Sequence, residues 1–257
     1  MKTLILLLPL VYLSSCNAPS TTKHMAAELH YEETTETYQE CVEDKCATVK
    51  LVYPVFEGDS MLAATMNRQV VEQNFTMWMN NDREFENLQA AVNAFFDDYK
   101  RFRNDFPEAA QEWSFETEAR VTHHSDDLIS IRFENFSYQG GAHPNTVVSY
   151  LNLDLSENAA VLVHEKMLMD SNKLLELAEQ KFRAYHEVEA GIGLEDDGRF
   201  FLDEDRFFLP AAMGYEGEEF VLLYNAYEIG PYAMGRTELR FSLKELEGVV
   251  YGGGSNE

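Results

Sequence analysis

Basic side chains and cysteine are scarce in this 257-residue sequence, and the scarcity of basic residues excludes whole classes of partner. Lys and Arg number 20 against 45 Asp and Glu, which gives a formal net charge of −25. Nucleic acids and anionic membrane surfaces both require a cationic protein surface, so neither is an expected partner. A cationic partner is electrostatically favoured, although an acidic surface can also serve solubility alone.

Long apolar runs are also missing, and the longest candidate lies at the N-terminus. Residues 4–13 are apolar and follow the basic Lys2, but a bilayer of about 30 Å needs about 20 apolar residues. The run ends in Leu13-Ser14-Ser15-Cys16, the pattern of a bacterial lipoprotein signal. We therefore expect residues 1–16 to be a signal peptide, with a lipid on Cys16 that anchors the protein to the membrane without spanning it. Ordinary secretion with cleavage elsewhere is the alternative, because Gly or Ala more usually precedes the cysteine.

Only two cysteines remain once Cys16 is assigned to lipid. An even pair in an exported chain predicts one disulfide, between Cys41 and Cys46. A polar turn separates the two cysteines and sequences typical of strands flank them, so the bond would fasten a hairpin. No second cysteine pair or spaced histidine pair completes a zinc ligand set, and we expect neither a metal nor a cofactor.

Composition divides the rest of the chain into a tether, a folded part and a tail. Residues 17–37 are rich in Thr, Ser, Ala and Glu without an apolar period, which predicts a flexible tether. Residues 38–250 read as one domain, or as two lobes covering 38–110 and 111–250. Residues 251–257 are rich in Gly and predict a disordered tail.

Hydrophobic periodicity within the folded part predicts both helices and strands. Apolar steps of three and four favour helices at 60–80 and 85–106, and a third from Asp170, a good N-cap, to about residue 189. An alternating pattern predicts strands at 113–121, 128–138 and 147–155, with 220–224 and 239–243 completing the sheet. The expected fold is α+β, an antiparallel sheet meander with helices packed on one face.

Two stretches are more specific than any periodicity: residues 138–146, which read YQGGAHPNT, and residues 224–235, which read YNAYEIGPYAMG. Together they resemble an extracytoplasmic domain family shared by the lysozyme-binding anti-sigma factor RsiV and the N-terminal part of the peptidoglycan deacetylase PdaC. The resemblance covers about residues 38–250 and implies an α+β domain of the cell envelope. It implies no shared activity, because we find no counterpart of the signalling parts of RsiV or of the deacetylase domain of PdaC.

These two stretches also supply the candidate ligand-binding residues. Paired glycines let a backbone adopt positive φ and approach a ligand closely, His and Asn side chains donate and accept hydrogen bonds, and tyrosines suit a sugar face or a protein interface. The alternative is purely structural, with glycines shaping a turn and tyrosines anchoring their own loop. The candidates are Tyr138, Gly140, Gly141, His143, Asn145, Tyr224, Asn225, Tyr227, Glu228 and Tyr232.

The expected function is therefore a non-enzymatic, lipid-anchored binding domain of the bacterial envelope, on the periplasmic side or the outer surface. Its partner would be a wall-active cationic protein of the lysozyme kind, or a peptidoglycan fragment. No catalytic residue is assigned. The alternative is an enzyme acting on wall glycans, with an acid–base pair drawn from Glu134, Asp154 and Glu228. A third possibility is an assembly or structural lipoprotein without a small ligand.

Overall fold

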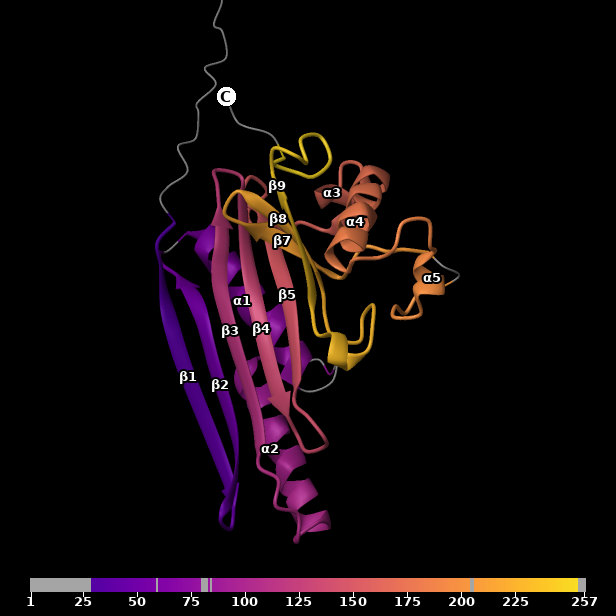
Figure 1. The fold of residues 1–257 in the computed structure, drawn as a ribbon. Coiled ribbons are helices and arrows are strands. Elements are labelled where there is room, and N and C mark those ends of the chain that lie inside the picture. Colours follow the sequence, from indigo (N-terminus) through magenta and orange to yellow (C-terminus); the bar gives the residue numbers. More distant parts are fainter. Residues whose placement is uncertain (1–28, 59, 80–82, 84, 204–205, 254–257) are drawn as a thin grey trace, which may run out of the picture.

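The computed structural model describes residues 29–58, 60–79, 83, 85–203 and 206–253, and these form two sheets with helices on the outside of each (Figure 1). The predicted signal peptide with Cys16, residues 17–28 of the predicted tether, and residues 254–257 lie outside the described residues. The larger sheet contains six strands in sequence order: β1 (Tyr31–Val42), β2 (Lys45–Phe56), β3 (Trp113–His124), β4 (Leu128–Tyr138), β5 (Asn145–Asp154) and β6 (Ala160–Val161). The smaller sheet contains β7 (Ala212–Glu216), β8 (Glu219–Tyr224) and β9 (Thr237–Ser242).

Six helices accompany the two sheets in the described part of the chain. The predicted α+β class is confirmed. The helices are α1 (Met61–Met79), α2 (Leu88–Asp105), α3 (His164–Met167), α4 (Ser171–Tyr185), α5 (Leu194–Asp197) and the 3₁₀ helix η1 (Tyr232–Met234). Local signals set the ends of the long ones. The Asn87 side chain accepts a hydrogen bond from the Ala90 N–H at the start of α2, and Asp170 caps α4 through the Lys173 N–H, as expected.

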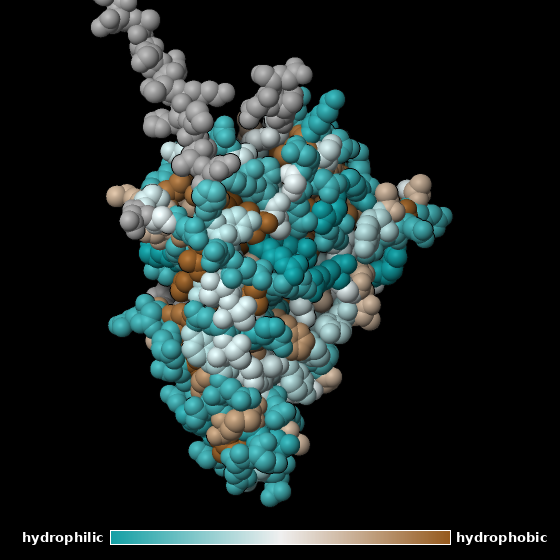
Figure 2. Space-filling view, turned by 90° about the vertical axis from the view of Figure 1, so that its left-hand side faces the viewer, coloured by the Kyte–Doolittle hydropathy of each residue, from teal (hydrophilic) through white to brown (hydrophobic). Residues whose placement is uncertain are grey.

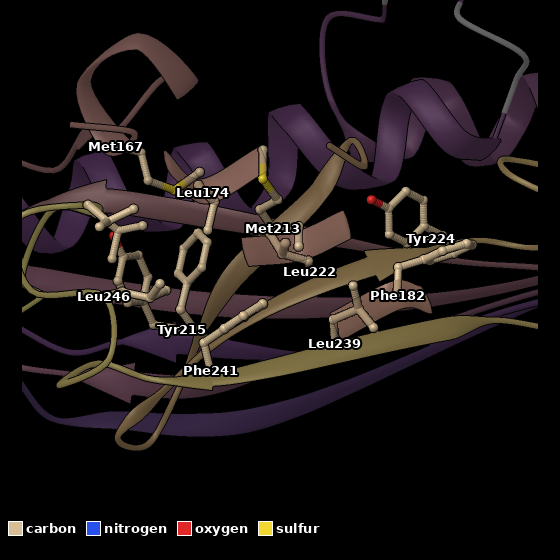
Figure 3. Close-up of a cluster of buried hydrophobic side chains, with 14 of the residues drawn as sticks. Met167, Leu174, Phe182, Met213, Tyr215, Leu222, Tyr224, Leu239, Phe241 and Leu246 are labelled. Carbon is tan, nitrogen blue, oxygen red and sulfur yellow. The ribbon is translucent and has the colours of Figure 1, made fainter. Parts of the chain in front are cut away.

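The elements stack as four layers, in the order α1 and α2, the large sheet, the small sheet, and α4. Aromatic side chains of α2 fill the first interface, where the Phe95 ring lies 5.8 Å from Trp113 and 6.5 Å from Phe115, between ring centroids. A small apolar cluster that includes Val148 and Ala212 joins the two sheets. The third interface is the cluster of Figure 3, in which Phe182 of α4 packs against the small sheet.

Two features of the topology differ from the expected meander. β2 pairs with β3 in parallel, from Ala47 opposite Trp113 to Val52 opposite Glu118, and α1 and α2 form the crossover that a parallel pair requires. The runs at 220–224 and 239–243 do not complete the large sheet but form the small one with β7. An alternating pattern marks a strand with one buried face, but it does not say which strand lies next to it.

The folded part also begins earlier and ends later than composition predicts. β1 starts at Tyr31, within the segment expected to be tether, because pairing with β2 along its whole length stabilises a Thr- and Glu-rich edge strand that has no apolar period. At the other end, the Tyr251 N–H donates to the Met167 carbonyl and the Tyr251 carbonyl accepts from the Tyr215 hydroxyl. Tyr251 is therefore part of the fold and not of a disordered tail.

The β1–β2 hairpin is fastened at its turn. Cys41 and Cys46 stand directly opposite each other in the register and form a disulfide, with their Cα atoms 4.0 Å apart. The side of the molecule that carries this hairpin is mostly hydrophilic, and apolar side chains reach its surface only in scattered patches (Figure 2).

The described ends of the chain lie together at one end of the molecule (Figure 1). The β1–β2 turn and the connection between β4 and β5 lie at the opposite end. Since β1 alone contains 12 residues, the two ends are separated by about 40 Å along this strand. Among the residues that the structure describes, no helix combines the length and apolarity needed to cross a bilayer.

Candidate functional site

The two loops that carry the candidate residues meet in space. The His143 ring, in the β4–β5 connection, stacks on the Tyr232 ring of η1 with centroids 3.9 Å apart and planes inclined by 16°. The Tyr227 hydroxyl lies 3.4 Å from His143 Nε2, and the Tyr227 ring centroid lies 5.6 Å from that of Tyr232. We call these three residues the ring cluster. Tyr227 is 56% and Tyr232 39% exposed, so the cluster offers its rings to solvent.

The β4–β5 connection owes its shape to its glycines. Gly140 and Gly141 adopt φ values of 96° and 109°, a region that side chains rarely allow. The Tyr138 hydroxyl donates to the Gly141 carbonyl at 3.3 Å, and His143 Nδ1 lies 3.0 Å from the Pro144 carbonyl oxygen. Because a carbonyl only accepts, this contact places the proton of the neutral ring on Nδ1 and leaves Nε2 to accept from Tyr227.

The backbone of Tyr227 is strained, which is unusual for an exposed aromatic residue. Its φ is 69°, in the left-handed region that disfavours residues with a Cβ. The neighbouring Glu228 holds this turn, because its carboxylate accepts from the Ala211 N–H and from the Asn225 N–H, both at 2.8 Å. Strain of this kind persists only where the surroundings enforce it, and such residues cluster at binding sites.

Asn225, which is half-buried, and Tyr224, which is buried, position the loop. The Asn225 side-chain amide pairs with the Val148 backbone of β5, accepting from its N–H at 2.8 Å and donating to its carbonyl at 2.9 Å. Tyr224 is fully buried, its hydroxyl donates to the Phe208 carbonyl at 2.6 Å, and burial raises the pKa of that hydroxyl well above its usual range. These residues attach the small sheet to the large one beneath the ring cluster.

Tyr138 and Asn145 lie at the two ends of the β4–β5 connection. Asn145 is exposed at the start of β5, and Tyr138 is half-buried at the end of β4. Tyr138 also borders a surface cavity of about 660 Å³, together with Gln39 of β1 and Thr48 of β2. Sequence reasoning missed both of these residues, since only the register of β1, β2 and β3 brings them beside Tyr138.

The three carboxylates considered as an acid–base pair each have other partners. Glu134 pairs with Arg236 at 2.6 Å and Arg132 at 3.7 Å, while Asp154 accepts from the Ser156 backbone, the Ser156 hydroxyl and the Glu157 N–H.

The strand register also places two of these carboxylates, Glu134 and Asp154, far apart. Asp154 stands opposite Leu128, six positions along β4 from Glu134, a separation of about 20 Å. Glycosidase pairs lie about 5–10 Å apart, so Glu134 and Asp154 do not have that geometry. Within the described part of the chain, no three His, Cys, Asp or Glu side chains gather as metal ligands would.

Comparison with known proteins confirms the expected resemblance. Residues 40–146 match the family model described as deacetylase PdaC, and residues 165–244 match the model described as a protein of unknown function, DUF3298. The search of curated proteins found no match. His143 lies in the first matched segment, and Tyr227 and Tyr232 lie in the second, so the ring cluster forms where the two segments meet.

Solved structures from two bacteria share the fold. A DUF3298 family protein from Pseudomonas aeruginosa is 21% identical, with a TM-score of 0.61, and the match covers 89% of this chain and 97% of that one. A DUF3298 family member from Bacteroides fragilis is also 21% identical, with a TM-score of 0.62, and the match covers 90% and 96%.

Proposed function

We propose that this chain, which joins a PdaC-type segment to a DUF3298 segment, is a lipid-anchored binding domain of the bacterial envelope that recognises a cationic wall-active protein of the lysozyme kind. The observation that carries the proposal is the ring cluster. Two loops more than 80 residues apart in sequence combine there to expose stacked aromatic side chains on a strained, well-supported backbone.

The chemistry of the cluster suits a protein interface. Tyrosine rings contribute large contact areas with few rotatable bonds, and their hydroxyl groups find hydrogen-bond partners across an interface. The net charge of −25 adds long-range attraction toward a basic partner, which raises the association rate and weakens with salt.

The position of the cluster suits an anchored protein. His143 belongs to the β4–β5 connection, which lies at the end of the molecule opposite the one where the described chain begins and ends (Figure 1). A lipid on Cys16 would hold that end toward the membrane, and the ring cluster would then face outward, toward the wall.

The carboxylates considered for the enzyme alternative each bind other groups of the protein, which favours the binding role. Glu228 holds two backbone N–H groups, Glu134 is paired with arginines, and Asp154 caps a turn. A peptidoglycan fragment is the second candidate ligand, and a separate observation, the cavity beside Tyr138, favours it.

Calorimetric titration of the purified protein with a c-type lysozyme, at low and at physiological salt, tests the proposal. We expect binding that weakens with salt but survives physiological salt, and we expect Tyr232→Ala to weaken it by roughly tenfold or more. Tyr185→Ala is the matched control, because Tyr185 is 55% exposed on α4, outside the ring cluster. Absence of binding at low salt, or equal loss in both variants, would contradict the proposal.

A further inference from the structure

Four uncharged hydrogen-bonding side chains form a straight row across the large sheet. Gln39 stands opposite Thr48, Thr48 opposite Ser114, and Ser114 opposite Tyr138 in the strand register. We call Gln39, Thr48, Ser114 and Tyr138 the neutral row. With neighbouring strands about 4.8 Å apart, the neutral row spans about 14 Å from β1 to β4.

The neutral row points to the side of the sheet away from α1 and α2. Its sequence neighbours Ala47, Val49 and Phe115 are buried against those helices, and successive residues of a strand face opposite ways. The small sheet reaches β3 near its far end, where the Gly217 N–H donates to the Thr122 carbonyl. The neutral row therefore stays open, with Gln39 exposed and the other three half-buried.

A surface cavity of about 660 Å³ lies over the neutral row, a size that suits a small ligand. Its lining is unusual for so acidic a protein, because Glu112 is the only charged side chain among the described residues that line it. Hydroxyl and amide groups that donate and accept, beside a tyrosine ring, match the alternating hydroxyl groups and apolar faces of a sugar. A charged ligand would find one carboxylate and no cation in this lining.

The disulfide forms one border of this cavity. Cys46 is part of the lining, and its N–H donates to Glu112 Oε1 at 3.4 Å, which connects the end of the hairpin to the segment before β3. β2 is paired with β3 from Ala47 to Val52, so the turn residues before Ala47 lie outside this pairing. Gln39 precedes Cys41 by two positions and Thr48 follows Cys46 by two, so the bond closes the hairpin next to the neutral row.

We propose that the neutral row is a binding site for a neutral, hydroxyl-rich ligand of the saccharide class, and that the Cys41–Cys46 disulfide keeps this site formed. The inference deepens the second candidate of the proposed function, the peptidoglycan fragment, and rests on it. It does not depend on protein binding, because none of the four side chains belongs to the ring cluster. The site and the ring cluster are neighbours, since the Tyr138 hydroxyl bonds the Gly141 carbonyl in the connection that also carries His143.

Titration of the ¹⁵N-labelled protein with the tetrasaccharide of β-1,4-linked N-acetylglucosamine, followed by NMR, tests the site. We expect amide shifts in β1, β2 and the start of β3, and Thr48→Val and Ser114→Ala should each weaken binding roughly fivefold through the loss of one hydrogen bond. Thr37→Val is the matched control, because Thr37 is exposed two positions from Gln39 on the same face of β1. Absence of shifts at millimolar tetrasaccharide, or equal weakening by Thr37→Val, would overturn the inference.

Further measurements test the role of the disulfide and distinguish the saccharide site from the proposed protein-binding site. Reduction of the disulfide by dithiothreitol, and independently the double variant Cys41→Ser/Cys46→Ser, should weaken tetrasaccharide binding while the NMR spectrum of the small sheet stays unchanged. Unaltered affinity in the reduced protein would refute the role of the disulfide. Tyr232→Ala should leave tetrasaccharide binding intact, so a failure of lysozyme binding and a failure of the saccharide site are distinguishable.

Discussion

Tyr227 and Glu228 are adjacent, yet their side chains have opposite roles. The Tyr227 ring is exposed beside His143, whereas the Glu228 carboxylate turns inward and accepts two backbone N–H groups. Glu228 therefore has a structural role, although it lies in a stretch that was considered for ligand binding. Here its role is to hold the backbone in which the neighbouring Tyr227 adopts a positive φ.

Removing the Glu228 carboxylate should destabilise the protein. Glu228→Ala leaves the Ala211 and Asn225 N–H groups without their acceptor, and we expect a loss of about 1–3 kcal/mol in the free energy of unfolding. Urea denaturation followed by circular dichroism measures the loss. Glu247→Ala, at an exposed position, is the control and should change stability little. A midpoint equal to that of the unaltered protein would show that the carboxylate does not support the turn.

At the scale of elements, the attachment of the small sheet to the large one positions the ring cluster. Apolar packing around Val148 is one part of it, and a group of charge-assisted bonds around Glu216, at the end of β7, is another. The Glu216 carboxylate accepts from the Tyr150 hydroxyl of β5 at 2.6 Å and pairs with Arg240 of β9 at 2.6 Å and Arg132 of β4 at 3.4 Å. Four strands from both sheets meet at one carboxylate.

This arrangement makes sheet attachment dependent on pH. Burial by itself disfavours the charged carboxylate, but hydrogen bonds from Tyr150 and Arg240 outweigh it and hold the pKa of Glu216 below its ordinary value of 4.5. A carboxyl group with a lowered pKa in the folded state stabilises the fold above its unfolded pKa. That contribution is lost as the pH falls through the lower, folded value.

We therefore expect Glu216→Gln to lower the melting temperature at neutral pH, and the difference from the unaltered protein to shrink as the pH falls below about 4.5. Thermal unfolding followed by circular dichroism, from neutral pH to about pH 3, measures both curves. Glu247→Gln serves as the control and should follow the unaltered protein. A difference that stays constant over this range would mean that ionised Glu216 does not stabilise the fold.

At the scale of the whole molecule, the direction of the strands separates the described start of the chain from the candidate binding sites. β1 runs from the described start of the chain to the disulfide-bonded turn, over about 40 Å. The ring cluster and the neutral row both depend on the β4–β5 connection, which lies toward that turn. An anchor at the chain start would leave both sites free to meet ligands from the wall side.

Anchoring through Cys16 is testable in bacterial cells. We expect the protein to fractionate with membranes and to incorporate labelled palmitate, and we expect Cys16→Ser to abolish the labelling, because no other cysteine is available once Cys41 and Cys46 are bonded. Serine at position 15 offers a control, since Ser15→Ala should leave both properties unchanged. Palmitate labelling that persists in the Cys16→Ser variant would refute the assignment.

The amino-acid sequence by itself determined the elements whose signals are local. Apolar spacing and a cap residue are contained within a few turns, so α2 and α4 were predicted close to their observed bounds, and alternation predicted β4 at its observed bounds. The two stretches that supply the candidate residues were also singled out from the sequence, through their resemblance to a known family.

Tertiary structure alone decided which of these elements lie side by side. The parallel pairing of β2 with β3, the separate small sheet and the neutral row all depend on contacts between residues far apart in sequence, and no local pattern encodes a register. Gly214 is an example of a residue whose role the sequence alone does not reveal. A Cβ there would lie 2.2 Å from the Tyr150 ring, so the close approach of the two sheets requires glycine, and the reason is visible only when both sheets are in place.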